Sequence, residues 1–213
     1  MTNIFSEVDE DIRKERYKNI WNKYGKYLIA LIVLLVIAFS LNQFYQEKKL
    51  LANESLLEKY LLALESVEKK QIDFSIDNLK TVYTGENKML SAFSGLKLSE
   101  IYFLSDNKDE SLTVLSSLYL NDSLDQIYRE LALYKFIMID FNNISPSTIE
   151  KKIKSIKKDK LILEPYFQEL IGIKYLLSKD IVKANLIFTN LILDENIPID
   201  LIARLKKLIK ISN

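Results

Sequence analysis

Apolar residues are most concentrated near the N-terminus of the chain. Residues 27–41 read YLIALIVLLVIAFSL, in which Ser40 is the only polar residue. No charged residue occurs anywhere in the longer segment 27–46. A helix that crosses a bilayer needs about 20 mostly apolar residues. Segment 27–46 is therefore predicted to be a single transmembrane helix.

Beyond residue 46 the apolar residues recur at helical spacing. No run alternates with a period of two between turn residues, as a strand would. Short polar breaks separate segments of helical length, which pair into hairpins. The predicted pairs are 53–70 with 73–83, 88–104 with 108–120, 123–140 with 146–158 and 165–178 with 181–193, followed by a closing helix at 198–211. The pattern predicts an all-α protein with an N-terminal transmembrane helix and a helical domain over residues 47–213.

Two of these hairpins have the residue spacing of a tetratricopeptide repeat. In that pattern a small residue is followed by an aromatic residue three positions on, a small residue nine further, and an aromatic residue four further. The matching residues are Gly172, Tyr175, Ala184 and Phe188 in the last hairpin and Ser99, Tyr102, Ser111 and Leu115 about two repeat lengths earlier. Small residues let two helices approach closely, and large residues fill the groove beside them.

The other two hairpins match this pattern poorly. Segment 151–160, KKIKSIKKDK, has no small residue where the pattern requires one. We predict a tetratricopeptide-like α-solenoid of about four hairpins, in which the closing helix caps the open end. An ordinary helical bundle with the same helix lengths is the alternative.

Basic residues near the ends of the predicted span indicate its orientation. Six precede it and only two follow closely: Arg13, Lys14, Arg16, Lys18, Lys23 and Lys26, against Lys48 and Lys49. The positive-inside rule places segment 1–26 in the cytoplasm and the domain 47–213 across the membrane, in the periplasm of a Gram-negative bacterium. A signal peptide cleaved after Ser40 is the competing interpretation, and the acidic residues of segment 1–26 argue against it.

Composition excludes several classes of function. The chain of 213 residues has no Cys and no His, so it lacks thiolate and imidazole nucleophiles and bases and the Cys/His ligands of zinc. Its four glycines are dispersed, whereas a phosphate-binding loop needs several close together. A net charge of +1 gives no basic excess for nucleic acid. We expect no catalytic residues, no cofactor, no metal site, no nucleic-acid partner and no small-molecule substrate.

The first 25 residues carry a family resemblance. Residues 4–13 read IFSEVDEDIR and are followed by Trp21, by Tyr24-Gly25 and then by the apolar segment. This layout resembles alphaproteobacterial tetratricopeptide-like inner-membrane proteins. They are grouped with the ancillary subunit of the SecYEG translocon and share a domain with a periplasmic cell-division coordinator. The resemblance implies a periplasmic, chaperone-like domain that binds translocon subunits or exported polypeptides and has no catalytic residues.

A protein-binding domain needs an accessible surface for its partner. Four tyrosines are predicted to line a concave groove for peptide: Tyr60, Tyr119, Tyr128 and Tyr166. The leading hypothesis is a membrane-tethered, non-enzymatic binding module at the translocon. A structural scaffold for envelope assembly or cell division is the alternative, and an enzyme that uses only carboxylates is the third.

Overall fold

The structure, a computed structural model, describes residues 3–156 and 160–212. Within these residues it contains nine α-helices. They are α1 (Asn3–Glu68), α2 (Ile72–Tyr83), α3 (Lys88–Leu104), α4 (Lys108–Leu120), α5 (Gln126–Ile139), α6 (Pro146–Ile156), α7 (Glu164–Leu177), α8 (Ile181–Ile192) and α9 (Ile199–Ser212). The all-α prediction is confirmed, and α2 to α9 begin and end close to their predicted bounds.

The chain divides into two compact units, Met1–Glu54 and Ser55–Asn213. The division falls inside α1. In the first unit, the side chains at 3–12, 15, 19, 20, 25, 28–30, 32 and 33 lie outside the described part of the chain. The predicted segments 1–26 and 27–46 are therefore described only in part. Among the residues that were described, no helix combines the length and the apolar composition that a membrane crossing requires.

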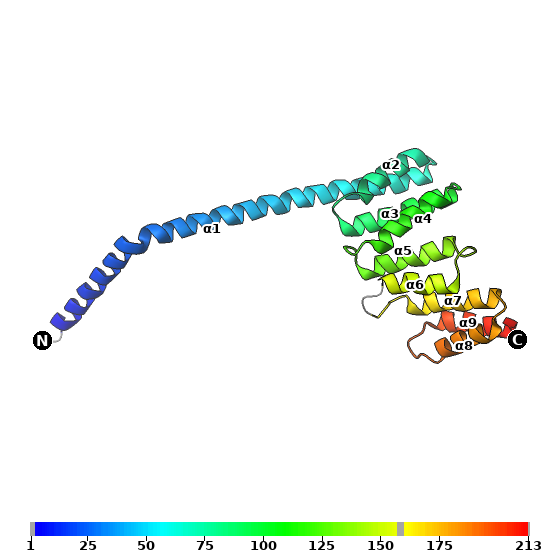
Figure 1. Cartoon of the computed structure of the whole chain (residues 1–213). Helices are drawn as coiled ribbons and strands as arrows, with labels where there is room; N and C mark the ends of the chain where they lie inside the picture. Colours follow the sequence, from blue (N-terminus) through cyan, green and yellow to red (C-terminus); the bar gives the residue numbers. More distant parts are fainter. Residues whose placement is uncertain (1–2, 157–159, 213) are drawn as a thin grey trace. The chain divides into compact units, whose positions relative to one another are not determined.

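In the second unit each helix packs against the next one along the chain. Figure 1 shows α2 to α7 following one another in chain order, with α8 and α9 at the C-terminal end, and successive helices from α2 to α9 are in contact. The sequential packing is antiparallel. Contacts also join α3 to α5 and α4 to α6. The first helices α3 and α5 thus form one layer and the second helices α4 and α6 another.

Three of the hairpin turns have the same backbone conformation. Lys70, Asp106 and Lys179 stand at equivalent positions with φ of 61°, 62° and 64°. The N–H of the next residue donates to a carbonyl five positions back: Gln71 to Ser66 at 2.8 Å, Asn107 to Tyr102 at 2.9 Å and Asp180 to Tyr175 at 2.9 Å. This Schellman arrangement satisfies helix carbonyls that would otherwise lack a donor. The α1–α2, α3–α4 and α7–α8 hairpins therefore reverse direction in the same way.

The α5–α6 hairpin has a longer turn, residues 140–145. Lys108 on α4 donates to Asp140 Oδ1 at 3.0 Å, and Asn143 donates to the same oxygen at 3.0 Å. On α6, Lys152 lies over the rings of Tyr119 and Phe136, with its ammonium 5.2 Å and 4.3 Å from their centroids. The basic segment of α6 thus contributes one lysine to packing while Lys151 and Lys154 are exposed.

The core continues from one hairpin to the next. Its largest cluster lies among α3 to α7, and its fully buried residues include Leu115, Leu133, Ile149 and Phe167. At the C-terminal end, α9 buries Leu201 and Leu205 completely against α7 and α8. Burial of each leucine contributes roughly 1.5–3 kcal/mol. The last helix therefore covers apolar surface that the α7–α8 hairpin would otherwise expose.

Candidate functional site

The residues that match the tetratricopeptide spacing lie where the two helices of a hairpin approach most closely. Gly172 and Tyr175 lie on α7, and Ala184 and Phe188 lie on α8. A Cβ at Gly172 would stand 2.3 Å from Cε1 of Phe188, so the ring occupies the space that a side chain would need. Ala184 and Phe188 are fully buried. This set forms the contact between α7 and α8.

The second set forms the equivalent contact between α3 and α4. Ser111 donates through Oγ to the carbonyl of Ser99 at 2.8 Å, and the two hydroxyl oxygens are 3.0 Å apart. Both serines are buried, and Leu115 is fully buried beside them. Tyr102 is half-buried in the neighbouring cluster with Leu98 and Ile101. Hydrogen bonding lets two serines replace the glycine and alanine of the last hairpin.

A third small pair, which the sequence interpretation missed, joins α1 to α2. Ser75 donates through Oγ to the carbonyl of Ala63 at 2.9 Å, and both residues are fully buried. Ala63 and Ser75 are separated by 12 residues (75 − 63), as are Ser99 and Ser111 (111 − 99). The recurrence of this 12-residue separation between small residues was the signal in the sequence from which the third pair could have been predicted. On α6, the position that corresponds to Ser75 on α2 and Ser111 on α4, three residues after the helix begins, is occupied by Ile149 instead of a small residue.

The four tyrosines predicted to line a groove lie on different helices and do not form one site. Tyr60, Tyr128 and Tyr166 are half-buried on α1, α5 and α7. Burial of its hydroxyl raises the pKa of Tyr60. The ring of Tyr128 meets Phe93 edge to face at 5.4 Å, and that of Tyr166 meets Tyr134 at 6.4 Å.

The position of Tyr119 does not suit a binding groove. Its side chain is only 4% exposed, on the second helix of its hairpin. Its hydroxyl accepts a hydrogen bond from Lys152 at 2.8 Å, and its ring packs on Phe136 at 5.6 Å. Tyr119 is a core residue of the α4–α6 contact, and its ring is not available to a partner.

A groove of about 360 Å³ lies between α3 and α5. Eight residues line it: Ser99, Glu100, Phe103, Leu131, Tyr134, Lys135, Met138 and Ile139. Both helices are the first of their hairpins, so the groove opens on the layer that they form. Apolar walls with a few polar groups are the usual composition of a protein binding site. We take this groove as the candidate functional site, and of the predicted residues only Ser99 lies in it.

Two exposed apolar side chains dominate this groove. Phe103 on α3 is 47% exposed and Met138 on α5 is 50% exposed. Large apolar residues that converge in one exposed hollow mark an interaction surface more often than isolated ones do. Phe103 and Met138 are separated by 35 residues (138 − 103), close to one repeat length. This spacing was a signal in the sequence that the prediction of the four tyrosines did not take into account.

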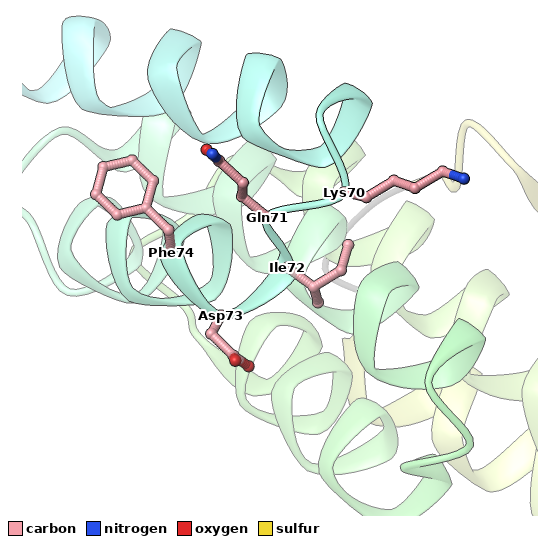
Figure 2. A pocket seen from close by; sticks show the side chains of 5 residues that line it. All are labelled: Lys70, Gln71, Ile72, Asp73 and Phe74. Carbon is pink, nitrogen blue, oxygen red and sulfur yellow. The ribbon is translucent and has the colours of Figure 1, made fainter.

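A second hollow lies at the turn between α1 and α2. Its volume is about 440 Å³, and Lys70, Gln71, Ile72, Asp73 and Phe74 line it. Figure 2 shows that these side chains diverge, with Phe74 and Lys70 pointing to opposite sides. A ligand site requires polar groups that converge. This hollow is therefore a weaker candidate than the α3–α5 groove.

Within the described parts of the chain, no group of three or more carboxylates lies close enough to hold a metal ion. Compared with known proteins, the chain matches no family model, no curated protein and no solved structure.

Proposed function

We propose that this chain is a non-enzymatic protein-binding module that a membrane helix at 27–46 holds at a membrane. The observation that carries the binding role is the α3–α5 groove, in which Phe103 and Met138 present apolar surface on the layer of first helices. Partner recognition commonly depends on a few apolar anchors that enter such a hollow. A partner segment that covers the groove would remove these two side chains from water.

The repeated hairpin geometry supports a tetratricopeptide-like solenoid. Equivalent positive-φ turns and small-residue pairs occur in the α1–α2, α3–α4 and α7–α8 hairpins. Asp106 follows Lys70 by 36 residues (106 − 70), and Lys179 follows Asp106 by 73 (179 − 106), about two such intervals. Stacked hairpins of this kind present extended binding surfaces. The α3–α5 groove would be part of such a surface.

Exposed apolar residues in the first unit support the membrane tether. Leu34, Val36, Ile37 and Phe39 are each at least half exposed. Successive helical residues are about 100° apart, so these four side chains point in different directions around the helix. A helix that is apolar on every side needs an apolar environment. A bilayer provides that environment for the predicted span.

Polar groups at the predicted span are arranged as a bilayer requires. Ser40 donates through Oγ to the carbonyl of Val36 at 2.9 Å, which satisfies its hydroxyl within the helix. At the N-terminal end, the Lys26 ammonium lies 5.1 Å from the ring centroid of Tyr27. At the other end, the Lys48 ammonium lies 4.8 Å from that of Phe44. Lysine and aromatic side chains favour the two membrane–water interfaces.

The cysteine-free sequence allows a direct test of the tether and its direction. We expect a cysteine introduced at Lys207 to react with a membrane-impermeant maleimide in cells whose outer membrane has been permeabilised. A cysteine introduced at Lys14 should react only after the inner membrane is opened, because the basic side of the span stays in the cytoplasm. The unmodified chain is the control for background labelling. Equal labelling at both positions in cells with an intact inner membrane would contradict the proposed topology.

The binding role is tested by crosslinking from the groove in living cells. A photoreactive amino acid at Met138 should crosslink to translocon subunits or exported polypeptides, the partners that the resemblance of residues 4–25 implies. The same amino acid at Val182 on α8, which is 80% exposed, is the matched control. Mass spectrometry identifies the crosslinked proteins. The same crosslinked products at the same yield from both positions would contradict the proposed binding role of the groove.

A further inference from the structure

The charges around the α3–α5 groove indicate what kind of segment it receives. Lys135 lies in the groove on α5 and is half-buried. In the described part of the chain its ammonium takes part in no hydrogen bond or ion pair. Partial burial of a charge is unfavourable unless a partner compensates for the lost water. Lys135 is therefore suited to an acceptor that a bound partner supplies.

The other charges near the groove already have partners. Glu100 on the opposite wall accepts a hydrogen bond from Lys97 at 3.0 Å. On the next first helix, Glu169 accepts from Arg204 at 2.9 Å and 3.0 Å. Arg204 also donates to Asp200 at 3.0 Å, so each of these carboxylates has a basic partner. Tyr134 adds no charge, because burial raises the pKa of its hydroxyl above the ordinary value. Lys135 is thus the charge left uncompensated in the groove.

We propose that this groove binds peptide segments that combine a large apolar side chain with a nearby carboxylate. The apolar side chain lies between Phe103 and Met138, and the carboxylate pairs with the Lys135 ammonium. The inference rests on the proposed function, because it names the chemistry of the partner that the binding module receives. Charge complementarity chooses among partners, since a basic segment would place a second cation beside Lys135.

The experiment uses short fluorescent peptides and the full chain in mild detergent. Each peptide carries one Phe between leucines and one variable position, Glu, Gln or Lys, placed at several distances from the Phe. Fluorescence anisotropy gives their affinities. We expect the best Glu peptide to bind about fivefold more tightly than its Gln counterpart, as a partly exposed ion pair of about 1 kcal/mol would give. The Lys peptide should bind least, and added salt should reduce the preference for Glu.

Variants assign the preference to particular side chains. Lys135→Gln should make the affinities of the Glu and Gln peptides equal. Lys154→Gln removes the same charge from an exposed position on α6 and should leave the preference intact. Met138→Asp should weaken all the peptides, whereas Val182→Asp on α8 should weaken none. Met138 and Val182 are both exposed, so neither replacement disturbs the core.

The outcomes separate this inference from the proposed function. Equal affinity for Glu and Gln peptides, or a Glu preference that survives Lys135→Gln, overturns the inference. Binding that still depends on Met138 would in that case uphold the groove as a binding site. If no peptide binds, the inference is overturned, and crosslinking from position 138 decides the proposed function independently.

Discussion

Gly172→Ala is expected to lower the free energy of unfolding of the second unit by about 2–3 kcal/mol, as overpacking of a filled site does. The new Cβ would stand 2.3 Å from Cε1 of Phe188 and 2.9 Å from its Cδ1 and Cζ. Alanine is the better helix former by about 1 kcal/mol. The clash outweighs this gain because the Phe188 ring is fully buried, and a close-packed interior leaves little room for it to move.

A double-mutant cycle tests whether the ring is the cause. Phe188→Leu removes Cε1 and Cζ, two of the three ring atoms nearest the new Cβ, and by itself destabilises the chain by leaving space. In that background we expect Gly172→Ala to be nearly neutral, so the two changes are strongly non-additive. Urea unfolding of the full chain in mild detergent, followed by circular dichroism, gives the four free energies. If Gly172→Ala had the same effect in both backgrounds, the α7–α8 contact would not be limited by this ring.

The close contact at Gly172 was open to prediction because it is local. Gly172 and Phe188 are separated by one short turn, and the spacing of two helices and a turn fixes which residues meet. The α1–α2 hairpin shows where this reasoning weakens. Ser66 and Leu79 stand where the pattern has aromatic residues, and only the small pair Ala63 and Ser75 remains. Two residues gave too little signal for a repeat to be assigned.

The groove was harder to predict than the contacts within a hairpin, because it depends on how successive hairpins stack. Phe103 and Met138 line one groove only because α3 contacts α5, and no local spacing determines that contact. The isolation of Lys135 likewise depends on which carboxylates the other helices bring near it. Tyr119 shows the opposite case, a residue that was predicted to line a groove and does not. Its aromatic side chain predicts a place in a binding groove, but it lies on the second helix of a hairpin and is buried against Phe136 and Lys152.

Glu130→Ala is expected to destabilise the chain by about 3 kcal/mol, because Glu130 is a buried acid with structural hydrogen bonds. Its side chain is fully buried on α5. The backbone N–H of Ile162 donates to its Oε1 at 3.2 Å, and that of Leu163 donates to its Oε2 at 2.6 Å. Gln126 donates to Oε1 at 2.6 Å. Hydrogen bonds to a charged group contribute about 1.5–3 kcal/mol each, and buried donors left without an acceptor add their desolvation cost.

The Glu130→Gln variant tests the contributions of the two carboxylate oxygens separately. Glu130→Gln keeps one acceptor oxygen but turns a donor toward the other N–H, so we expect a loss between that of alanine and zero. Glu150→Ala, an exposed acid on α6, is the control and should change stability by no more than about 0.5 kcal/mol. Urea unfolding measures all three. An effect of Glu130→Ala no larger than that of Glu150→Ala would show that the connection into α7 does not depend on this carboxylate.

The place at which Glu130→Ala loses protection from hydrogen exchange gives a sharper test than the size of the loss in stability. Leu163 immediately precedes α7, so Glu130 fixes the point at which the chain enters that helix. Through these hydrogen bonds the Glu130 side chain connects α5 to the start of α7. Hydrogen exchange in Glu130→Ala should accelerate first at residues 161–167 and leave the α3–α4 hairpin protected. Uniform acceleration across α3 to α9 would instead mean that the α5–α6 and α7–α8 hairpins unfold as one cooperative unit, with no separate opening at their junction.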